Sequence, residues 1–269
     1  MICFIEECHS DTILHYPIIK KLEERKMNYV IYDVKGKSII DTIHFFSQNP
    51  TIKKVVSYGG SLGKLTVATL CKEYELLFIN LHGNERGGDS VMESVLGTIS
   101  SLAYQNFVSG DVARWFLLEN GVETPIGFFE CPITHLARKS KDLEPIDVVY
   151  IGTDRVKISV HEKELKKHKH KYKMFDLSEG LPRDWRDIYS YLKNAKYVVS
   201  DLFVFDKPSR YMNKHFFYFG DHIFDGQNLG KSTHTVSKKF ELHDYLNQSW
   251  SPLENINQKW GLEPLINLL

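Results

Sequence analysis

Short apolar runs alternate with amphipathic stretches along the first half of the chain. The runs have the length of buried strands, and the stretches between them carry apolar residues at helical spacing. The strands predicted from this pattern are Ile2–Ile5, Tyr29–Asp33, Lys54–Tyr58, Leu76–Leu81, Asn106–Ser109 and Ile126–Phe129. The helices predicted between them are Ile13–Lys26, Ile39–Gln48, Leu65–Tyr74, a stretch from Val91, and Val112–Asn120. Strands that alternate with helices predict a parallel sheet with right-handed crossovers.

A charged segment with few apolar residues, from Ala137 to Pro145, separates this series from a second one, and we expect it to link two domains. The second series predicts the strands Ile146–Ile151, Met174–Leu177, Tyr197–Asp201 and His215–Phe219, and the helices Trp185–Asn194 and Lys239–Gln248. The fold class is therefore α/β, with an N-terminal Rossmann-like domain over residues 1–140 and a C-terminal one over 145–250. A helical tail over 251–269 is expected to pack back on the N-terminal domain. Ligands usually bind in the cleft between two such domains.

Composition and charge narrow the class of protein. The 34 basic and 34 acidic residues cancel, so the overall charge does not call for nucleic acid or membrane as a partner. No apolar run approaches the ~20 residues needed to span a bilayer, and no secretory signal is present, so we expect a soluble, cytoplasmic protein. The 4 cysteines form no C-x-x-C pair, which argues against a metal site built on cysteine.

The loop after the fourth strand is the richest candidate for a site. Ligands in open α/β sheets bind beyond the carboxyl ends of the strands. This loop carries an imidazole, a guanidinium and two acids, at His82, Arg86, Glu85 and Asp89. Its glycines would let a ligand approach the backbone closely. The alternative is a polar surface loop that uses its glycines only to turn.

Two other turns occupy the same edge of the predicted sheet. His9 and Asp11 follow the first strand, and either could act as a general base, although an acid at this position also commonly caps a helix. The run 59–64 resembles a phosphate-binding P-loop but lacks the glycine and the Ser or Thr that this motif requires. Gly60 and Ser61 could still hold an anion or a sugar hydroxyl at the start of the next helix.

A basic run, Lys166–Lys173, is the strongest local charge feature. Such runs are usually solvated faces. The alternative is a patch that tracks phosphates, in which Lys169 would be joined by Arg183 and Arg186.

Several segments between Lys54 and Leu136 resemble, in order and spacing, the N-terminal domain of the non-hydrolysing UDP-N-acetylglucosamine 2-epimerases. They are the run 55–63, the run 80–89, Glu93, the pair of runs 112–114 and 119–122, and Cys131–Ile133. The resemblance implies a GT-B fold: two facing Rossmann-like domains, a nucleotide sugar in the cleft and a final helix that crosses back. Two acids of that family are replaced here, one at Gly60 and one at Leu81 or His82, and only Glu93 aligns with a family carboxylate.

A shorter run, Ile146–Arg155, is similar to the start of the second domain of phage DNA glucosyltransferases, which are also GT-B enzymes. This similarity implies that Gly152, Thr153 and Arg155 grip a nucleotide diphosphate, through backbone amides and a charge-assisted bond. Further donor-binding candidates are Lys157, Asp201, Ser209 and Arg210, the last two in place of a glutamate that usually binds the ribose.

Taken together, these features predict a metal-independent GT-B glycosyltransferase that needs no cofactor. Its donor would be a UDP-linked sugar, and its base would be His9, Asp11 or His82, with Glu85 or Glu93 orienting the sugar or the base. The basic run makes a modified base in DNA a candidate acceptor. Two alternatives stay open: an enzyme like the UDP-N-acetylglucosamine 2-epimerases, and a GT-B protein that binds nucleotide sugars without catalysis.

Overall fold

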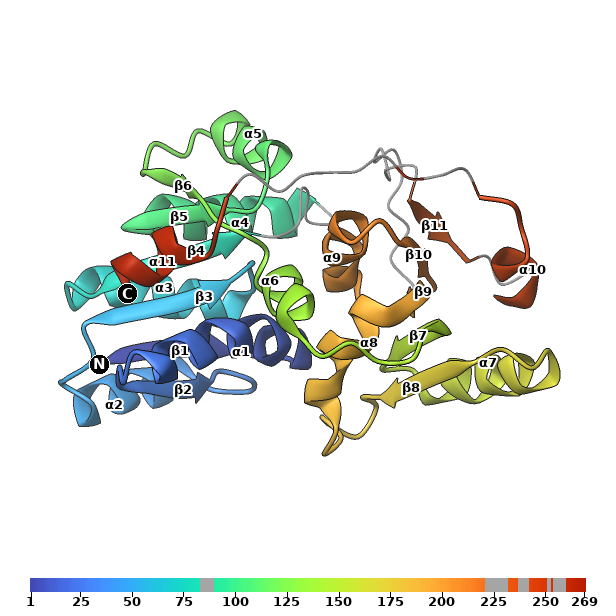
Figure 1. Cartoon of the computed structure of the whole chain (residues 1–269). Helices are drawn as coiled ribbons and strands as arrows, with labels where there is room; N and C mark the ends of the chain where they lie inside the picture. The colour runs from blue at the N-terminus through green and yellow to red at the C-terminus, as the bar shows by residue number, and fades with distance from the viewer. Residues whose placement is uncertain (83–89, 221–231, 237–241, 251–252, 254–259) are drawn as a thin grey trace. The chain divides into compact units, whose positions relative to one another are not determined.

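The computed structural model describes residues 1–82, 90–220, 232–236, 242–250, 253 and 260–269 (Figure 1). The chain forms two compact units. One comprises Met1–Pro132 together with Lys259–Leu269, and the other comprises Ile133–Gln258. Among the described residues, no helix has the length and apolar character needed to cross a membrane.

The N-terminal unit is built on a six-stranded parallel sheet in the order β2-β1-β3-β4-β5-β6. Its strands are β1 (Ile2–Glu6), β2 (Tyr29–Asp33), β3 (Lys54–Tyr58), β4 (Leu77–His82), β5 (Gln105–Val108) and β6 (Ile126–Phe128). Its helices are α1 (His9–Glu24), α2 (Ile39–Gln48), α3 (Leu62–Glu73), α4 (Ser90–Leu102), α5 (Asp111–Glu119) and α11 (Glu263–Leu268). All six strands predicted in this half are present.

Helices cover both faces of the sheet in this unit. Its strands are therefore buried on both sides and are nearly continuous apolar runs. On one face, Cys3 and Ile5 of β1 pack with residues from α2, α3 and α4, among them Phe46, Cys71 and Ile99. On the other face, Phe4 contacts His15 of α1.

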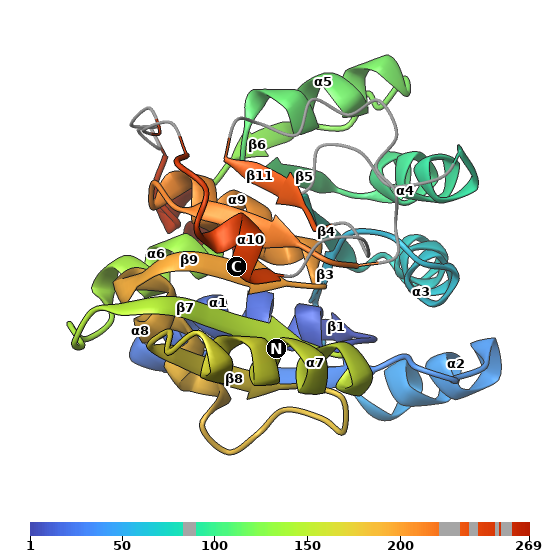
Figure 2. The ribbon, with the colours of Figure 1, turned by 90° about the vertical axis from the view of Figure 1, so that its right-hand side faces the viewer.

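The C-terminal unit is a five-stranded parallel sheet in the order β11-β10-β9-β7-β8. Its strands are β7 (Ile146–Gly152), β8 (Tyr172–Asp176), β9 (Ala195–Ser200), β10 (His215–Tyr218) and β11 (Thr233–Thr235). Its helices are α6 (Pro132–Lys139, of which Pro132 belongs to the other unit), α7 (Arg155–Lys167), η1 (Trp185–Asp187), α8 (Ile188–Asn194), η2 (Phe203–Phe205), α9 (Asp206–Tyr211) and α10 (Leu242–Leu246). Figure 2 shows α7 lying along β7 and β8.

The sequence prediction for this unit lacked α9 and β11 and differs from the structure in three further elements. The predicted linker from Ala137 begins inside α6. The charged residues at the end of this helix made it look like part of a linker. Helix α7 was not predicted, because its sequence is mostly charged and only two of its side chains, Ile158 and Leu165, are buried. The basic run begins at the end of this helix. The predicted helix Lys239–Gln248 is represented by α10, and its first residues lie outside the described part of the chain.

Each sheet has one switch point, where neighbouring strands connect onward in opposite directions. In the N-terminal unit it lies between β1, which leads to β2, and β3, which leads to β4. In the C-terminal unit it lies between β7, which leads to β8, and β9, which leads to β10. The carboxyl ends of strands at a switch point form the crevice where open α/β sheets bind ligands.

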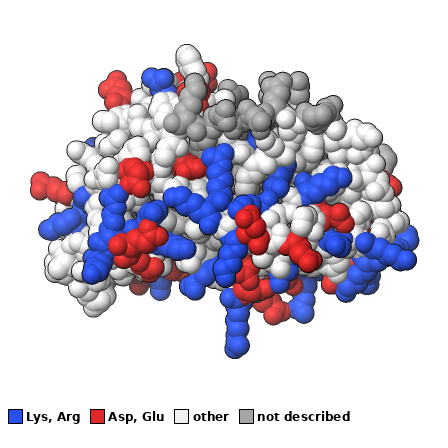
Figure 3. All heavy atoms as spheres, in the orientation of Figure 1, with Lys and Arg blue, Asp and Glu red and all other residues white. Residues whose placement is uncertain are grey.

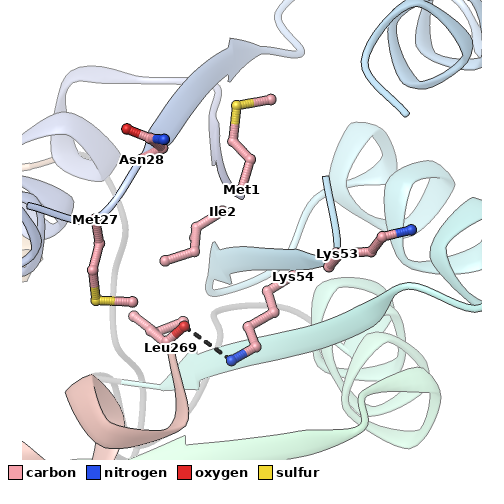
Figure 4. Close-up of a pocket in the computed structure, with 7 residues that line it drawn as sticks. All are labelled: Met1, Ile2, Met27, Asn28, Lys53, Lys54 and Leu269. Carbon is pink, nitrogen blue, oxygen red and sulfur yellow. Dashed lines mark hydrogen bonds between the residues drawn. The ribbon is translucent and has the colours of Figure 1, made fainter. Parts of the chain in front are cut away.

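The end of the chain packs on the N-terminal unit through several side chains. The Phe128 and Trp260 rings stack at 4.2 Å, and the Glu130 amide donates to the Gly261 carbonyl at 3.0 Å. Lys54 donates from Nζ to the Leu268 and Leu269 carbonyls, 2.5 and 2.9 Å away. Lys54 and Leu269 line a pocket of about 350 Å³ at the amino ends of the strands (Figure 4). This pocket lies at the edge opposite the switch point, so we do not take it as the ligand site.

Candidate functional site

A buried ion pair occupies the switch point of the N-terminal unit. Lys64 of α3 lies 2.7 Å from Asp11 of α1, measured from Nζ to Oδ1, and also donates to the Tyr58 carbonyl at 2.8 Å. The other oxygen of Asp11, Oδ2, accepts from the Glu7 and Cys8 amides at 2.9 and 3.3 Å. Both oxygens of Asp11 therefore hold the turn in place, and we do not assign Asp11 as the base.

The glycine turn after β3 is shaped by packing. Gly59 has a φ of +65°, a left-handed conformation that glycine adopts without strain. A Cβ on Gly60 would meet Leu96 of α4 at 3.3 Å, so the missing side chain lets α4 approach closely. Ser61 caps α3 by accepting from the Lys64 amide at 3.1 Å. Gly60 and Ser61 lie at the sheet's ligand-binding edge, and both serve the fold there.

His82, at the end of β4, is held in a buried polar network. Its Nε2 atom lies 3.0 Å from Asn106 Oδ1, 3.1 Å from Asn80 Nδ2 and 3.2 Å from Ser100 Oγ. Asn106 in turn donates to Thr124 Oγ1 at 2.7 Å and to the Ser100 carbonyl at 2.9 Å. Around Nε2, the Asn106 carbonyl oxygen can only accept and the Asn80 amide nitrogen can only donate. These contacts fix the orientation of the ring.

The remaining catalytic candidates lie near the same edge. His9 is the first residue of α1 and is half-buried. Glu93 is half-buried in the first turn of α4, where the helix dipole stabilises a carboxylate. Glu85, Arg86 and Asp89 lie outside the described residues.

A second carboxylate bridges the switch point of the C-terminal unit. Asp201, just after β9, accepts from the Thr153 amide at 2.8 Å, the Thr153 hydroxyl at 2.8 Å and the Asp154 amide at 3.0 Å. Asp154 caps α7 by accepting from the Val156 and Lys157 amides. The amides expected to hold a diphosphate are thus filled by side chains of the protein. A Cβ on Gly152 would meet Ile158 and Tyr150 at 3.0 Å, so this glycine too is required for packing.

The cationic donor candidates differ in how firmly they are engaged. Arg155 pairs with Glu179 at 2.5 Å, and both side chains are more than 70% exposed. Arg210 is mostly buried and pairs with Asp206 at 2.6 Å. Lys157 lies 3.6 Å from Asp154 and donates to the Phe219 carbonyl. The Ser209 hydroxyl is buried and donates to the Phe205 carbonyl at 2.6 Å. Of these residues, Arg155 is the one best placed to exchange its partner for a ligand.

The basic run is partly neutralised in the folded chain. Lys166 pairs with Glu162 at 2.9 Å and Lys173 with Asp184 at 2.5 Å. Lys169 is exposed after α7 with a φ of +56°. Arg183 and Arg186 are also exposed, and Arg186 lies over the Trp185 ring. Basic and acidic side chains are interspersed on the face shown in Figure 3. In the part of the chain that the structure describes, no group of His, Cys, Asp and Glu side chains could hold a metal ion.

Comparisons with known proteins show likeness in structure only. No protein-family model matches the chain, and no curated protein matches its sequence. MnaA of S. aureus, solved with UDP, matches with a TM-score of 0.73 and 11% identity over 99% of this chain and 95% of that one. The UDP-GlcNAc 2-epimerase of Methanocaldococcus jannaschii, in complex with UDP-GlcNAc and UDP, matches with a TM-score of 0.65 and 13% identity over 99% and 98%. The chain has the fold of the UDP-GlcNAc 2-epimerases.

This epimerase fold confirms the GT-B prediction and corrects the predicted activity. The Neisseria meningitidis UDP-GlcNAc 2-epimerase, bound to UDP-GlcNAc, also matches, with a TM-score of 0.65 and 11% identity over 99% of this chain and 97% of that one. The prediction of a glycosyltransferase was therefore wrong, and with it the prediction of DNA as acceptor. The ten-residue similarity to phage enzymes is too short to outweigh a match along almost the whole chain.

Two features of the site escaped the sequence analysis. Lys64 was weighed only as part of a P-loop pattern, although a lysine in a mostly apolar helix could have suggested a buried partner. Asn80 and His82 alternate within an apolar strand and so face the same side, which could have indicated a polar network beneath α4.

Proposed function

We propose that the chain is a sugar-nucleotide enzyme of the 2-epimerase kind that acts on a UDP-linked N-acetylhexosamine. The observation that carries this proposal is the epimerase fold along 99% of the chain, matched by structures that hold UDP or UDP-GlcNAc. At 8–13% identity such likeness concerns the fold, so the residues must supply the chemistry.

Epimerisation at C2 moves the hydrogen on that carbon from one face of the sugar to the other, which requires groups that take and return a proton. No carbonyl lies next to C2, so the electron pair of the broken C2–H bond would form a C1–C2 double bond as UDP leaves C1. Re-addition of UDP at C1 and of a proton on the opposite face of C2 would complete the step. His82 is our first choice for this role, because it ends β4 and its buried network fixes the orientation of the ring. Glu93 is our second choice, because it aligns with a family carboxylate and lies in the first turn of α4. His9 is the remaining candidate at this edge.

We propose that the C-terminal unit holds the nucleotide and that Arg155 contacts the diphosphate. Its present partner, Glu179, is exposed, and exposed ion pairs contribute only about 0–1 kcal/mol. A phosphate oxygen can replace that carboxylate at little cost. Arg210, by contrast, would leave the mostly buried Asp206 unpaired if it turned to a ligand.

Incubation with UDP-GlcNAc, followed by acid hydrolysis of the nucleotide sugars and chromatographic separation of the sugars set free, tests this function. We expect the C2 epimer, N-acetylmannosamine, to accumulate, and we expect less of it with a His82→Gln variant that folds normally. A sugar pool that stays pure N-acetylglucosamine at high enzyme concentration would exclude the activity.

A second candidate is a protein that binds nucleotide sugars without turning them over. The observation that favours it is that Asp11, Asp201 and Asp206 each have partners within the chain. Calorimetric titration with UDP-GlcNAc separates the two candidates, since binding without any change in the sugar would favour this one.

A further inference from the structure

The Lys64–Asp11 pair joins two turns that are 53 residues apart in sequence. The Lys64 side chain is 6% exposed and that of Asp11 is 4% exposed. Asp11 lies in the first turn of α1, the helix that follows β1. Lys64 lies in the first turn of α3, the helix that follows β3. The pair therefore spans the switch point of the N-terminal unit, where a ligand is expected.

Burying two charges is unfavourable unless their geometry is good and further hydrogen bonds satisfy them. Those bonds are present here. Lys64 also donates to the Tyr58 carbonyl, at the end of β3, and Asp11 also accepts from the Glu7 and Cys8 amides, just after β1. The ion pair thus connects the backbone of one turn to the backbone of the other.

We propose that Lys64 is a positioning residue, which locks the β1–α1 turn to the β3–α3 turn. The lock keeps His9, Gly60 and Ser61 in a fixed arrangement at the edge where the sugar nucleotide binds. Lys64 is buried and does not itself touch the ligand. The effect on the ligand rests on the proposed function, whereas the lock between the turns does not.

Amide hydrogen exchange tests the lock without reference to activity. In a Lys64→Met variant, Asp11 would be a buried carboxylate without its cation and would leave the turn for solvent. We expect the Glu7 and Cys8 amides to exchange at least about tenfold faster, with the Thr153 and Asp154 amides of the other unit unchanged. Lys21→Met is the control, because it removes an exposed partner of Glu24 on the same helix. Unchanged exchange at Glu7 and Cys8 would overturn the lock.

A double variant, Lys64→Met with Asp11→Asn, keeps the test meaningful if the single variant folds poorly. It leaves no buried charge unpaired, and the asparagine oxygen can still accept from the two amides. We expect exchange at Glu7 and Cys8 to stay faster than in the wild type, because no side chain then joins this turn to the Tyr58 carbonyl. Exchange at the wild-type rate would show that the acceptor at position 11 orders the turn alone and would overturn the lock.

Calorimetric affinity for UDP then tests the positioning role. We expect Lys64→Met to weaken binding about tenfold, the double variant to bind more weakly than the wild type as well, and Lys21→Met to bind normally. Faster exchange with unchanged UDP affinity would overturn the positioning role. If the wild-type protein binds no UDP, the proposed function fails, and the exchange experiment still decides the lock.

Discussion

Individual side chains at the two switch points show how the chain uses charge. Lys64 and Arg155 are both cations near the start of a helix that follows a strand, yet one is buried in an ion pair and the other is exposed beside Glu179. A buried cation is fixed by the carboxylate that it neutralises, whereas an exposed one can exchange partners. We therefore assign Lys64 to positioning and Arg155 to binding.

Changing Arg155 to Ala should weaken UDP binding by about tenfold or more, since a charge-assisted hydrogen bond contributes on the order of 1.5–3 kcal/mol. Folding stability should hardly change, because the pair with Glu179 is exposed. Isothermal titration calorimetry measures the affinity. Lys163→Ala, an exposed position on the same helix, is the matched control. Equal affinities of the two variants would show that Arg155 does not contact the diphosphate.

His161 makes the stability of the C-terminal unit depend on pH. The Tyr150 hydroxyl lies 2.8 Å from His161 Nδ1, within hydrogen-bonding distance. Burial, followed by the charge of Lys157, lowers the pKa of His161 from 6.5 to about 4. Between these values the unfolded chain binds more protons than the folded one. Stability is therefore full above about pH 6.5 and is lost as the pH falls toward 4.

Urea unfolding at pH 7.5 and pH 5 measures this loss, which we expect to be on the order of 2 kcal/mol for His161. His234, whose pKa burial and His215 likewise lower to about 4, contributes in the same window. A His161→Gln variant keeps an acceptor for Tyr150 but cannot titrate, so its loss should be smaller than that of the wild type. An identical loss in both proteins would rule out His161 as a source.

At the scale of elements, all strands but the short β11 (Thr233–Thr235) were predicted, whereas the contacts at the strand ends were not. The strands from β1 to β5 are short apolar runs between amphipathic helices, so their type follows from periodicity. Helix α7 was missed because charged residues dominate its sequence. Helix α6 was missed because its last residues, from Ala137, were assigned to a linker.

The candidate site shows the same limit. Position at the carboxyl end of a strand selected the turns that contain Asp11, His82 and Asp201, and a site at these turns stays a prediction. It could not reveal that Asp201 caps the Thr153 amide or that Lys64 neutralises Asp11, because these partners are 48 and 53 residues apart in sequence. Such pairings depend on tertiary packing.

The C-terminal end of the chain is anchored on the N-terminal unit by the stacking of the Trp260 ring on the Phe128 ring. The Arg114 guanidinium also lies over the Phe128 ring. Trp260→Ala should lower the free energy of unfolding by about 1 kcal/mol or more. It should also speed exchange of the Glu130 amide, which bonds to the Gly261 carbonyl. Hydrogen exchange and urea unfolding measure the two effects. Trp115→Ala, on the exposed face of α5, should leave the Glu130 amide unaffected. Equal protection of Glu130 in both variants would contradict this anchoring.

At the scale of the whole molecule, both units are Rossmann-like, and each has a carboxylate across its switch point. The fold matches UDP-GlcNAc 2-epimerases along almost the whole chain, and the sequence resemblance implies that two acids of that family are replaced here, one at Gly60. The central claim is that His82 and Glu93 supply enough acid–base chemistry for epimerisation without those acids. This claim requires that the bond between C2 of the sugar and its hydrogen is broken.

Proton NMR of UDP-GlcNAc incubated with the protein in D2O observes that bond directly. The account predicts that the C2 proton signal decays as deuterium enters from solvent, that signals of the C2 epimer appear, and that His82→Gln slows both changes. A C2 proton that stays fully retained while the protein demonstrably binds the nucleotide would contradict the account and leave a binding protein with an epimerase fold.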